Sequence, residues 1–326
     1  MAEPPTDRAA SDLAAALTAL DPVPARGGRA GWGAAALGQR LISLGLNERA
    51  VCACFAVRVP GHAPLRAATL PLPDPLPPAA VLPWLLAAGH PVPAATAERR
   101  LGVDLPRLIE LGLLARDGAD VRPAFMVLPA GRSLVVCTLD RPGGGARPDD
   151  SSYHLLGTLP ARRVDRWLDV GTGNGFLPLA ARALGAVMRA TDVDAGALAL
   201  ARAGALLSGA GDLELARADL LGGAGERPWP LVTFNAPLDG AIPLLERFHR
   251  ALPEVVADGG EALIHSVLAP GLVPATGQAI AARYTPAGVE PAFAVTWWRP
   301  GPARPPRMIE IALTGDRPHL RRADLE

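Results

Sequence analysis

The sequence predicts an α/β fold over its second half and a mostly helical region before it. After about residue 150, short apolar runs alternate with Ala-rich helical stretches, which is the pattern of a mostly parallel sheet. A glycine-rich turn at 171–175 directly follows one of these apolar runs and leads into a helical stretch. Because open α/β sheets bind ligands at the carboxyl ends of their strands, this turn is the first candidate for a ligand site.

Length and composition exclude several classes of protein. The chain has 326 residues and a mass of 33.7 kDa, enough for two domains. Its 32 basic residues, all of them Arg, are balanced by 32 acidic ones. A protein that coats nucleic acid needs a basic excess, so that class is disfavoured. The lack of Lys excludes Schiff-base enzymes and proteins with a P-loop lysine.

Neither cysteine nor histidine patterns indicate a metal site. Cys52, Cys54 and Cys137 support neither a disulfide framework nor a four-ligand zinc site, and the six histidines are scattered. The N-terminal residues lack the apolar core of a signal peptide, and no apolar run reaches about 18 residues. We therefore expect a reduced, cytoplasmic protein with no metal and no membrane partner.

The region before residue 145 is predicted to be mostly helical. Helices are expected at 11–20 and 34–44, and the apolar run at 51–59 is expected to be a strand. Three helices and a hairpin follow a proline-crowded connection, at 81–88, 94–101, 105–116, 121–128 and 133–139. This order predicts a winged-helix-like module. The third helix of this module carries Glu110 and only two arginines, which is a poor basic surface. We therefore expect the module to cap a substrate rather than to bind DNA.

A turn-rich segment from Arg141 to Pro148 marks a domain boundary. We predict an N-terminal tail and helix at 1–30 and a winged-helix-like substrate or cap domain at 31–145. The ligand-binding α/β domain is predicted at 146–326.

Polar side chains follow successive strands of the predicted sheet. The strands are expected at 166–170, 187–190, 213–220, 231–234, 261–268, 294–298 and 307–313, the last two as an antiparallel closing pair. Asp192, Asp219 and Asn235 stand at the carboxyl ends of the second, third and fourth strands. An acidic residue about 20 residues beyond the glycine turn is placed to accept the hydroxyls of a ribose. Asp194 is expected instead to cap the next helix.

These segments resemble class I S-adenosylmethionine-dependent methyltransferases. Residues 168–175, L-D-V-G-T-G-N-G, are similar to the first motif of that family, Thr191 to Asp194 to its ribose-binding segment, and Ala218 to Leu220 to its adenine-contacting segment. The resemblance covers about residues 150–326 and implies a seven-stranded Rossmann-like methyltransferase sheet with S-adenosylmethionine as cofactor. The cofactor-binding residues that it implies are Asp169, Gly171, Thr172, Gly173, Gly175, Asp192, Val193, Asp219, Leu220 and Asn235.

Residues 234–238, F-N-A-P-L, are similar to the N-P-P-Y tetrapeptide of enzymes that methylate planar nitrogens, with the nearest resemblance to N5-glutamine methyltransferases. The resemblance implies Asn235, Ala236 and Pro237 as catalytic residues. The candidate substrate contacts are Tyr153, His154 and Leu238. Leu238 replaces the aromatic ring that stacks on the acceptor, a contact worth about 1–3 kcal/mol for a base, so a nucleobase acceptor is disfavoured.

The sequence therefore predicts an S-adenosylmethionine-dependent methyltransferase that acts on a nitrogen of a protein or small-molecule acceptor. The acceptor is expected between the strand ends and the N-terminal module, because ligand sites favour domain interfaces. Two alternatives stay open. One is an rRNA or DNA base N-methyltransferase that uses the winged-helix module, and the other is a catalytically silent cofactor-binding scaffold.

Overall fold

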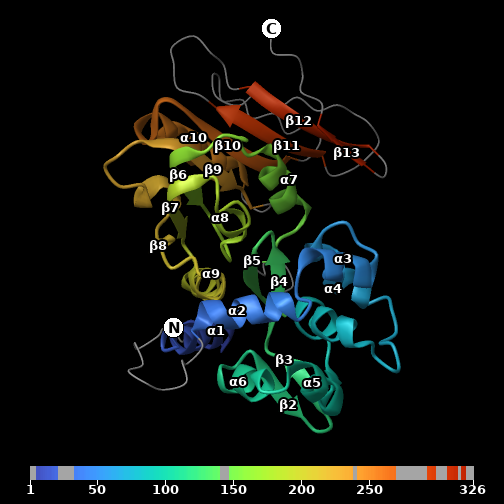
Figure 1. The fold of residues 1–326 in the computed structure, drawn as a ribbon. Helices are drawn as coiled ribbons and strands as arrows, with labels where there is room; N and C mark the ends of the chain where they lie inside the picture. Colours follow the sequence, from blue (N-terminus) through green and yellow to red (C-terminus); the bar gives the residue numbers. More distant parts are fainter. Residues whose placement is uncertain are drawn as a thin grey trace. The chain divides into compact units, whose positions relative to one another are not determined.

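The computed structural model describes residues 5–20, 33–139, 147–237, 241–268, 292–298, 307–314 and 317–320 (Figure 1). The chain divides into two compact units. The first joins Met1–Asp149 with Gly173–Ala180 and Asp194–Leu213, and the second joins Asp150–Thr172 with Ala181–Val193 and Glu214–Glu326. Each unit is therefore built from three separate segments of the chain. The domain boundaries expected at residues 30 and 145 stay a prediction.

The first unit is mostly helical. Its helices and helical turns are α1 (Pro5–Thr18), α2 (Ala34–Ser43), α3 (Glu48–Phe55), η1 (Pro60–His62), α4 (Ala63–Ala67), η2 (Pro78–Ala80), the π-helical turn η3 (Pro83–Ala87), α5 (Ala94–Leu101), α6 (Asp104–Glu110), α8 (Phe176–Ala180) and α9 (Ala195–Leu207). α9 is central, because α1, α2 and α8 all contact it. A Cβ at Gly38 of α2 would overlap the Leu207 carbonyl oxygen, so glycine is required for this close approach.

Two small antiparallel sheets complete this unit. β1 (Val92–Pro93), β2 (Leu114–Asp117) and β3 (Asp120–Pro123) form a sheet in the order β1-β3-β2. β4 (Phe125–Ala130) and β5 (Ser133–Thr138) form a separate hairpin. The Ser208 hydroxyl donates to the Leu134 carbonyl (3.1 Å) and accepts from the Leu134 amide (2.9 Å). These two bonds fasten the hairpin to the end of α9.

Residues 51–59 do not form the predicted strand, because most of them belong to α3 and the turn after it. The Asn47 side chain accepts a hydrogen bond from the Ala50 amide (3.0 Å) and so caps the start of the helix, and Ala56, at φ 53°, ends it. Val51 and Phe55, four residues apart, are both buried, which fits the helical period.

Two further predicted elements have different bounds. The helix expected at 105–116 ends at Glu110, and Gly112, at φ 74°, turns the chain into β2. The strand expected at 121–128 is interrupted at Ala124, so that it contributes to both β3 and β4.

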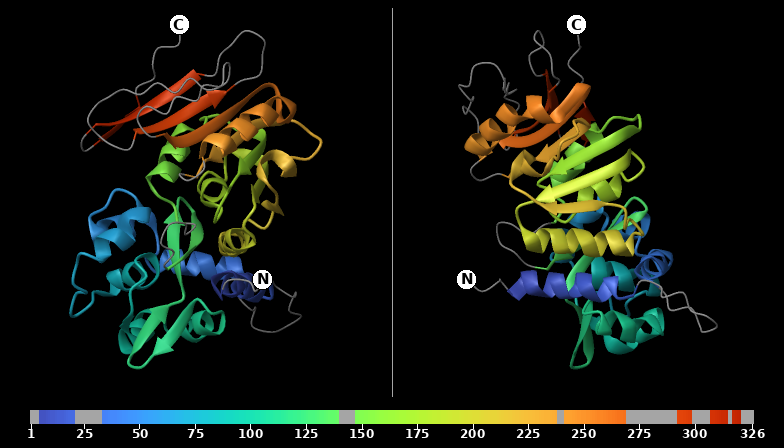
Figure 2. Two further views of the ribbon diagram at one scale, coloured as in Figure 1. Left: turned by 180° about the vertical axis from the view of Figure 1, so that it is seen from behind. Right: turned by 90° about the vertical axis from the view of Figure 1, so that its left-hand side faces the viewer.

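The second unit is built on one sheet in the order β13-β12-β11-β10-β9-β6-β7-β8 (Figure 2). The strands are β6 (Val164–Val170), β7 (Gly185–Asp192), β8 (Glu214–Arg217), β9 (Trp229–Asn235), β10 (Val256–Leu268), β11 (Ala292–Trp298), β12 (Arg307–Thr314) and β13 (Arg317–Leu320). Five neighbouring strands of this sheet, β8, β7, β6, β9 and β10, are parallel. β11, β12 and β13 extend the sheet in antiparallel pairs. The prediction of seven strands was therefore wrong, since within the described residues the antiparallel edge has three strands instead of the expected pair.

The central strands present an apolar and a polar face. On the apolar face, Val232, Phe234 and Ile264 join one buried cluster with residues of α10 (Ala241–Val255), and the Phe234 and Phe248 rings stack at 4.5 Å. Successive strand residues point to opposite faces, so the neighbours of these residues point the other way. Among those neighbours are Thr233 and His265. α7 (Asp150–Thr158) contacts β9, β10 and β11, and Ser151 of α7 bonds Asn235 of β9, which places α7 on the polar face.

None of the helices in the described part of the chain has the length and apolar character needed to cross a membrane.

Candidate active site

Asp169 is a buried carboxylate near the carboxyl end of β6, with 2% of its surface exposed. Its Oδ1 accepts a hydrogen bond from the Thr233 hydroxyl (2.5 Å), and that hydroxyl oxygen accepts the Trp167 indole N–H (2.8 Å). The parallel register of β6 and β9 places Asp169 opposite Thr233. Oδ2 has no donor within hydrogen-bonding distance among the described residues. The chain thus fixes one carboxylate oxygen and leaves the other for a donor of different origin.

The surroundings of Asp169 favour its neutral form. Burial raises its pKa to about 6, and the nearby negative charge of Asp192 acts in the same direction. The hydrogen bond from Thr233 and the nearby hydroxyl of Thr172 oppose the rise without cancelling it. A cationic group next to Oδ2 would favour the ionised carboxylate.

The glycine turn after β6 follows a path that side chains rarely allow. Gly171 has φ 62°, and a Cβ there would stand 3.2 Å from the Phe234 ring. Thr172 donates its amide hydrogen to the Thr191 carbonyl at the end of β7 (2.9 Å). Within the first unit, Gly173 and Gly175 have φ 58° and 78°, and a Cβ at Gly175 would stand 3.1 Å from Ala201 Cβ. The three glycines are therefore needed for this backbone path.

Asp192 and Asp194, two positions apart after β7, have different roles. Asp194 caps α9, because its Oδ1 accepts hydrogen bonds from the Gly196 amide (2.8 Å) and the Ala197 amide (3.3 Å). Asp192 ends β7 and is half-buried, and its carbonyl accepts the Ala218 amide (2.9 Å). Val193, between the two, is 61% exposed.

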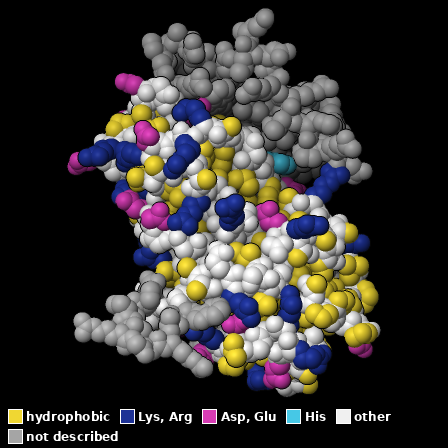
Figure 3. Space-filling view, in the orientation of Figure 1, with side chains coloured by type: hydrophobic (Ala, Val, Ile, Leu, Met, Phe, Trp, Pro, Cys, Tyr) yellow, Lys and Arg dark blue, Asp and Glu magenta, His cyan; other side chains and the backbone are white. Residues whose placement is uncertain are grey.

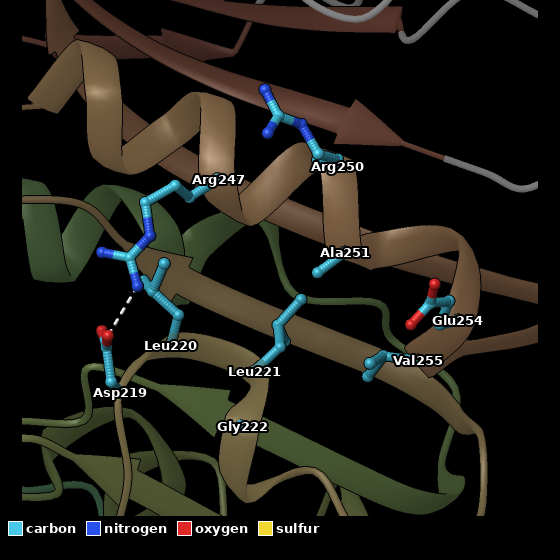
Figure 4. A pocket seen from close by; sticks show the side chains of 9 residues that line it. All are labelled: Asp219, Leu220, Leu221, Gly222, Arg247, Arg250, Ala251, Glu254 and Val255. Atoms are coloured by element: carbon cyan, nitrogen blue, oxygen red, sulfur yellow. Dashed lines mark hydrogen bonds and ion pairs between the residues drawn. The ribbon is translucent and has the colours of Figure 1, made fainter.

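Asp219 follows β8 and faces a groove of about 500 Å³ between η4 (Leu220–Gly223) and α10 (Figure 4). Its Oδ2 forms an ion pair with Arg247 Nη2 of α10 (2.5 Å). Leu220, at φ 47°, and Arg250 also line the groove. Asp219, which the resemblance assigns to contact with the adenine of the cofactor, is thus already paired with Arg247 of the chain.

Asn235 ends β9 and is anchored to α7. Its Nδ2 donates to the Ser151 hydroxyl (2.8 Å), with the Ser152 hydroxyl at 3.4 Å. Its buried Oδ1 finds no hydrogen-bond partner among the described residues. Ala236 is buried and donates its amide to the His265 carbonyl (2.9 Å). The amide nitrogen of Asn235 is therefore used by the fold, while its carbonyl oxygen is left for a donor.

The remaining predicted residues are distributed as follows. Pro237 is exposed, Tyr153 and His154 lie half-buried on α7, and Leu238 lies outside the described residues. Among the described residues, no group of three or more His, Cys, Asp or Glu side chains is placed to hold a metal ion.

Four residues around the site were not predicted. They are Thr233 beside Asp169, Ser151 beside Asn235, His265 opposite Asn235 on β10, and Arg247 beside Asp219. His265 follows the same rule as Asn235, a polar residue near the carboxyl end of a parallel strand, and that signal was available in the sequence.

The sequence of residues 143–266 matches the protein family described as the methyltransferase small domain. This stretch includes the described strands β6 to β9. No curated protein matches the sequence. Two similar solved structures are the ribosomal protein L11 methylase from Lactobacillus delbrueckii subsp. bulgaricus (24% identity, TM-score 0.32) and a precorrin-6y C5,15-methyltransferase from Geobacter metallireducens (18% identity, TM-score 0.31). Each overlap covers 36% of this chain and 58% or 61% of the other, so the chain spans about six tenths of their length.

The methyltransferase-type α/β fold predicted from the sequence agrees with the matched domain. The predicted cofactor, S-adenosylmethionine, is confirmed for the matched domain.

The side chains present fit this cofactor, which carries a cationic ammonium group, a sulfonium and a ribose. Asp169 Oδ2 is a buried acceptor without a donor among the described residues, and it suits a cation. Asp192 is a half-buried carboxylate near the carboxyl end of the neighbouring strand, and it suits hydroxyl groups. At Gly171 the backbone has no side chain to stand between it and a ligand.

Proposed function

We propose that the chain is an S-adenosylmethionine-dependent methyltransferase that methylates a nitrogen of a protein or small-molecule acceptor. The observation that carries the nitrogen assignment is the orientation of Asn235. Its Nδ2 is held by Ser151, so its Oδ1 is the atom left to accept a hydrogen bond, and the described residues offer it no donor. An N–H group of the acceptor supplies such a donor.

The chain's own residues align the acceptor. The bound cofactor supplies a methyl group that its sulfonium already activates. Asn235 Oδ1 and the carbonyl of Ala236 hold the N–H groups, which directs the nitrogen lone pair toward the methyl. The amide of Ala236 donates to the His265 carbonyl, which fixes the backbone of this segment to β10. Catalysis here consists of alignment and exclusion of water.

The cofactor residues in this proposal are those that the sequence resemblance implies. They are Asp169, Gly171, Thr172, Gly173, Gly175, Asp192, Val193, Asp219, Leu220 and Asn235. Asp169 and Asp192 have the strongest support, from the carboxylate oxygen of Asp169 without a donor and from the position of Asp192 near the end of β7.

We propose that the N-terminal module is a winged-helix-like substrate or cap domain. The order η3, β1, α5, α6, β2, β3 and the sheet β1-β3-β2 support this class. Arg116 pairs with Glu98 (2.8 Å) and Arg122 with Asp117 (3.8 Å), so two arginines of the hairpin already have acidic partners. On the face shown in Figure 3, Arg side chains lie scattered among apolar and acidic ones. Both observations favour a cap over a nucleic-acid grip.

Calorimetry with S-adenosylhomocysteine tests the cofactor, and tritiated S-adenosylmethionine with a cell lysate tests the acceptor. We expect binding to the wild-type chain and label in the protein or small-molecule fraction. Label confined to nucleic acid would move the assignment to a base methyltransferase. Binding without label in any fraction would favour a cofactor-binding scaffold, and no binding at all would end the proposal.

A further inference from the structure

Two of the six histidines of the chain lie close together on the polar face of the sheet, beside Asn235. The ring of His154 on α7 and the ring of His265 on β10 have centroids 6.0 Å apart and planes inclined by 35°. His265 is fully buried, and His154 is half-buried. A histidine pair of this kind is a candidate for proton transfer, because imidazole changes its charge near neutral pH.

The strand register and the helix period both connect this pair to Asn235. His265 lies opposite Asn235 in the parallel pairing of β10 with β9, and its carbonyl accepts the amide hydrogen of Ala236. Ser151, which bonds Asn235 Nδ2, and His154 are three residues apart on α7 and therefore share one side of the helix. The same helix side that anchors Asn235 thus carries the half-buried histidine.

We propose that His154 accepts the proton that the acceptor nitrogen loses, and that His265 positions it. The inference rests on the proposed function, because a nitrogen that carries hydrogen and gains a methyl group must give up a proton to become neutral. In this step the N–H bond of the acceptor breaks and its electron pair stays on nitrogen. A new N–H bond forms on the His154 imidazole, which later releases the proton to water.

The other titratable groups near His265 belong to few elements. α7 contributes Asp150 and Tyr153, and β10 contributes Glu261 on the same face, where it pairs with Arg162 (3.6 Å). β9 and β11 contain no titratable residue. The titratable residues of α10 belong to the helix that covers the opposite face; they are Glu246, Arg247, His249, Arg250 and Glu254. His154 is therefore the nearest basic group that these elements bring to His265.

The first test needs no acceptor. The full-length chain, labelled on its histidines, is titrated by NMR between pH 5 and 9 as wild type, as His154→Gln and as the control His62→Gln, whose histidine lies in the first unit. We expect His154→Gln to displace the titration of His265 and His62→Gln to leave it unchanged. Independent titration of the two rings in the wild type would overturn the pairing.

The second test follows methyl transfer. Tritiated S-adenosylmethionine is used with the lysate fraction that takes up label, across the same pH range. We expect the wild-type rate to rise with pH through the histidine range. His154→Gln should abolish that rise and lower the rate at pH 7 by about 100-fold, with added imidazole restoring part of it. His265→Gln should weaken the pH dependence, while His62→Gln should match the wild type.

S-adenosylhomocysteine affinity distinguishes failure of this inference from failure of the proposed function. We expect the affinity of His154→Gln to stay within about twofold of wild type, the margin for a residue outside the cofactor contacts. An unchanged pH profile, or parallel loss of affinity and rate, would overturn the proton-acceptor role alone. A wild-type chain that does not bind S-adenosylhomocysteine would overturn the proposed function instead.

Discussion

Thr233 donates its hydroxyl hydrogen to Asp169 over 2.5 Å, across the parallel strands β9 and β6. The same hydroxyl accepts the Trp167 indole N–H, so three buried side chains form one short chain of hydrogen bonds. The arrangement orients the carboxyl group but supplies no positive charge to it. Burial therefore dominates and raises the pKa of Asp169 to about 6.

This raised pKa predicts that Asp169 makes the protein less stable as the pH rises. The ordinary pKa of the group is 3.8, so between about pH 4 and 6 the folded chain binds more protons than the unfolded chain. The free energy of unfolding then falls with rising pH, by about 3 kcal/mol in total, and levels off above about pH 7. Urea unfolding of the wild type and of Asp169→Asn at pH 4, 5, 6 and 7 measures the effect.

The difference between the two proteins isolates Asp169 from the other carboxyl groups. Asp169→Asn keeps an oxygen that can accept from Thr233 but cannot ionise. Its stability relative to wild type should therefore increase between pH 4 and pH 6. A difference that stays constant over this range would show that Asp169 titrates normally.

Asp192 and Asp194 form a matched pair for cofactor binding. We expect Asp192→Ala to weaken S-adenosylhomocysteine binding by about 1.5–3 kcal/mol, or roughly 10- to 150-fold, the range for hydrogen bonds to a charged group. Asp194→Ala removes the cap of α9 and should cost about 1 kcal/mol of stability while leaving the affinity nearly unchanged. Calorimetry and thermal unfolding separate the two effects, and an equal loss of affinity in both variants would contradict the assignment.

The ion pair between Asp219 and Arg247 predicts competition for the same carboxylate. The two side chains are 61% and 57% exposed, so the pair contributes at most about 1 kcal/mol to stability. If Asp219 contacts the cofactor, Arg247→Ala should tighten S-adenosylhomocysteine binding by up to about fivefold, because the carboxylate no longer has to leave its partner. The gain should shrink in 1 M salt, which screens exposed charges.

Arg250→Ala is the control for this prediction. Arg250 lines the same groove, so its loss changes the net charge of the groove equally without touching the Asp219 pair. An equal gain in S-adenosylhomocysteine affinity in both variants would indicate a general charge effect. It would contradict competition between Arg247 and the cofactor for Asp219.

The parallel core of the sheet and its polar strand ends were predictable because their signals are local. Each buried strand is a short apolar run, and the turn at Gly171 is marked by its own glycines. The segment around Val51 was predicted to be a strand because apolar residues stand there at alternate positions. Apolar residues also stand four positions apart in the same segment, which is the helical spacing that the structure follows. The side chain of Asn47 decides between the two by capping a helix.

The partners of the site residues were not predictable, since they depend on strand register and helix placement. Thr233 meets Asp169 only because β9 pairs with β6 in one particular register. Ser151 meets Asn235 although 84 positions separate them in the sequence. Register is set by the whole sheet, so the identity of these neighbours appears only in the folded chain.

Asn235 and its anchor on α7 give the last prediction, which concerns the rate of methyl transfer. We expect Asn235→Ala to lower kcat by about 100-fold and to weaken S-adenosylhomocysteine binding much less, because its interaction with the acceptor is made mainly in the transition state. Ser151→Ala keeps Asn235 but frees its amide to rotate, and should lower kcat by about 3- to 10-fold, the value of one hydrogen bond. Ser152→Ala is the matched control, since its hydroxyl lies at 3.4 Å from Nδ2 rather than 2.8 Å and should matter less. Transfer from tritiated S-adenosylmethionine ranks the three variants. Full activity in Asn235→Ala would remove the nitrogen-acceptor assignment, and a larger effect in Ser152→Ala than in Ser151→Ala would show that a different hydroxyl orients the amide.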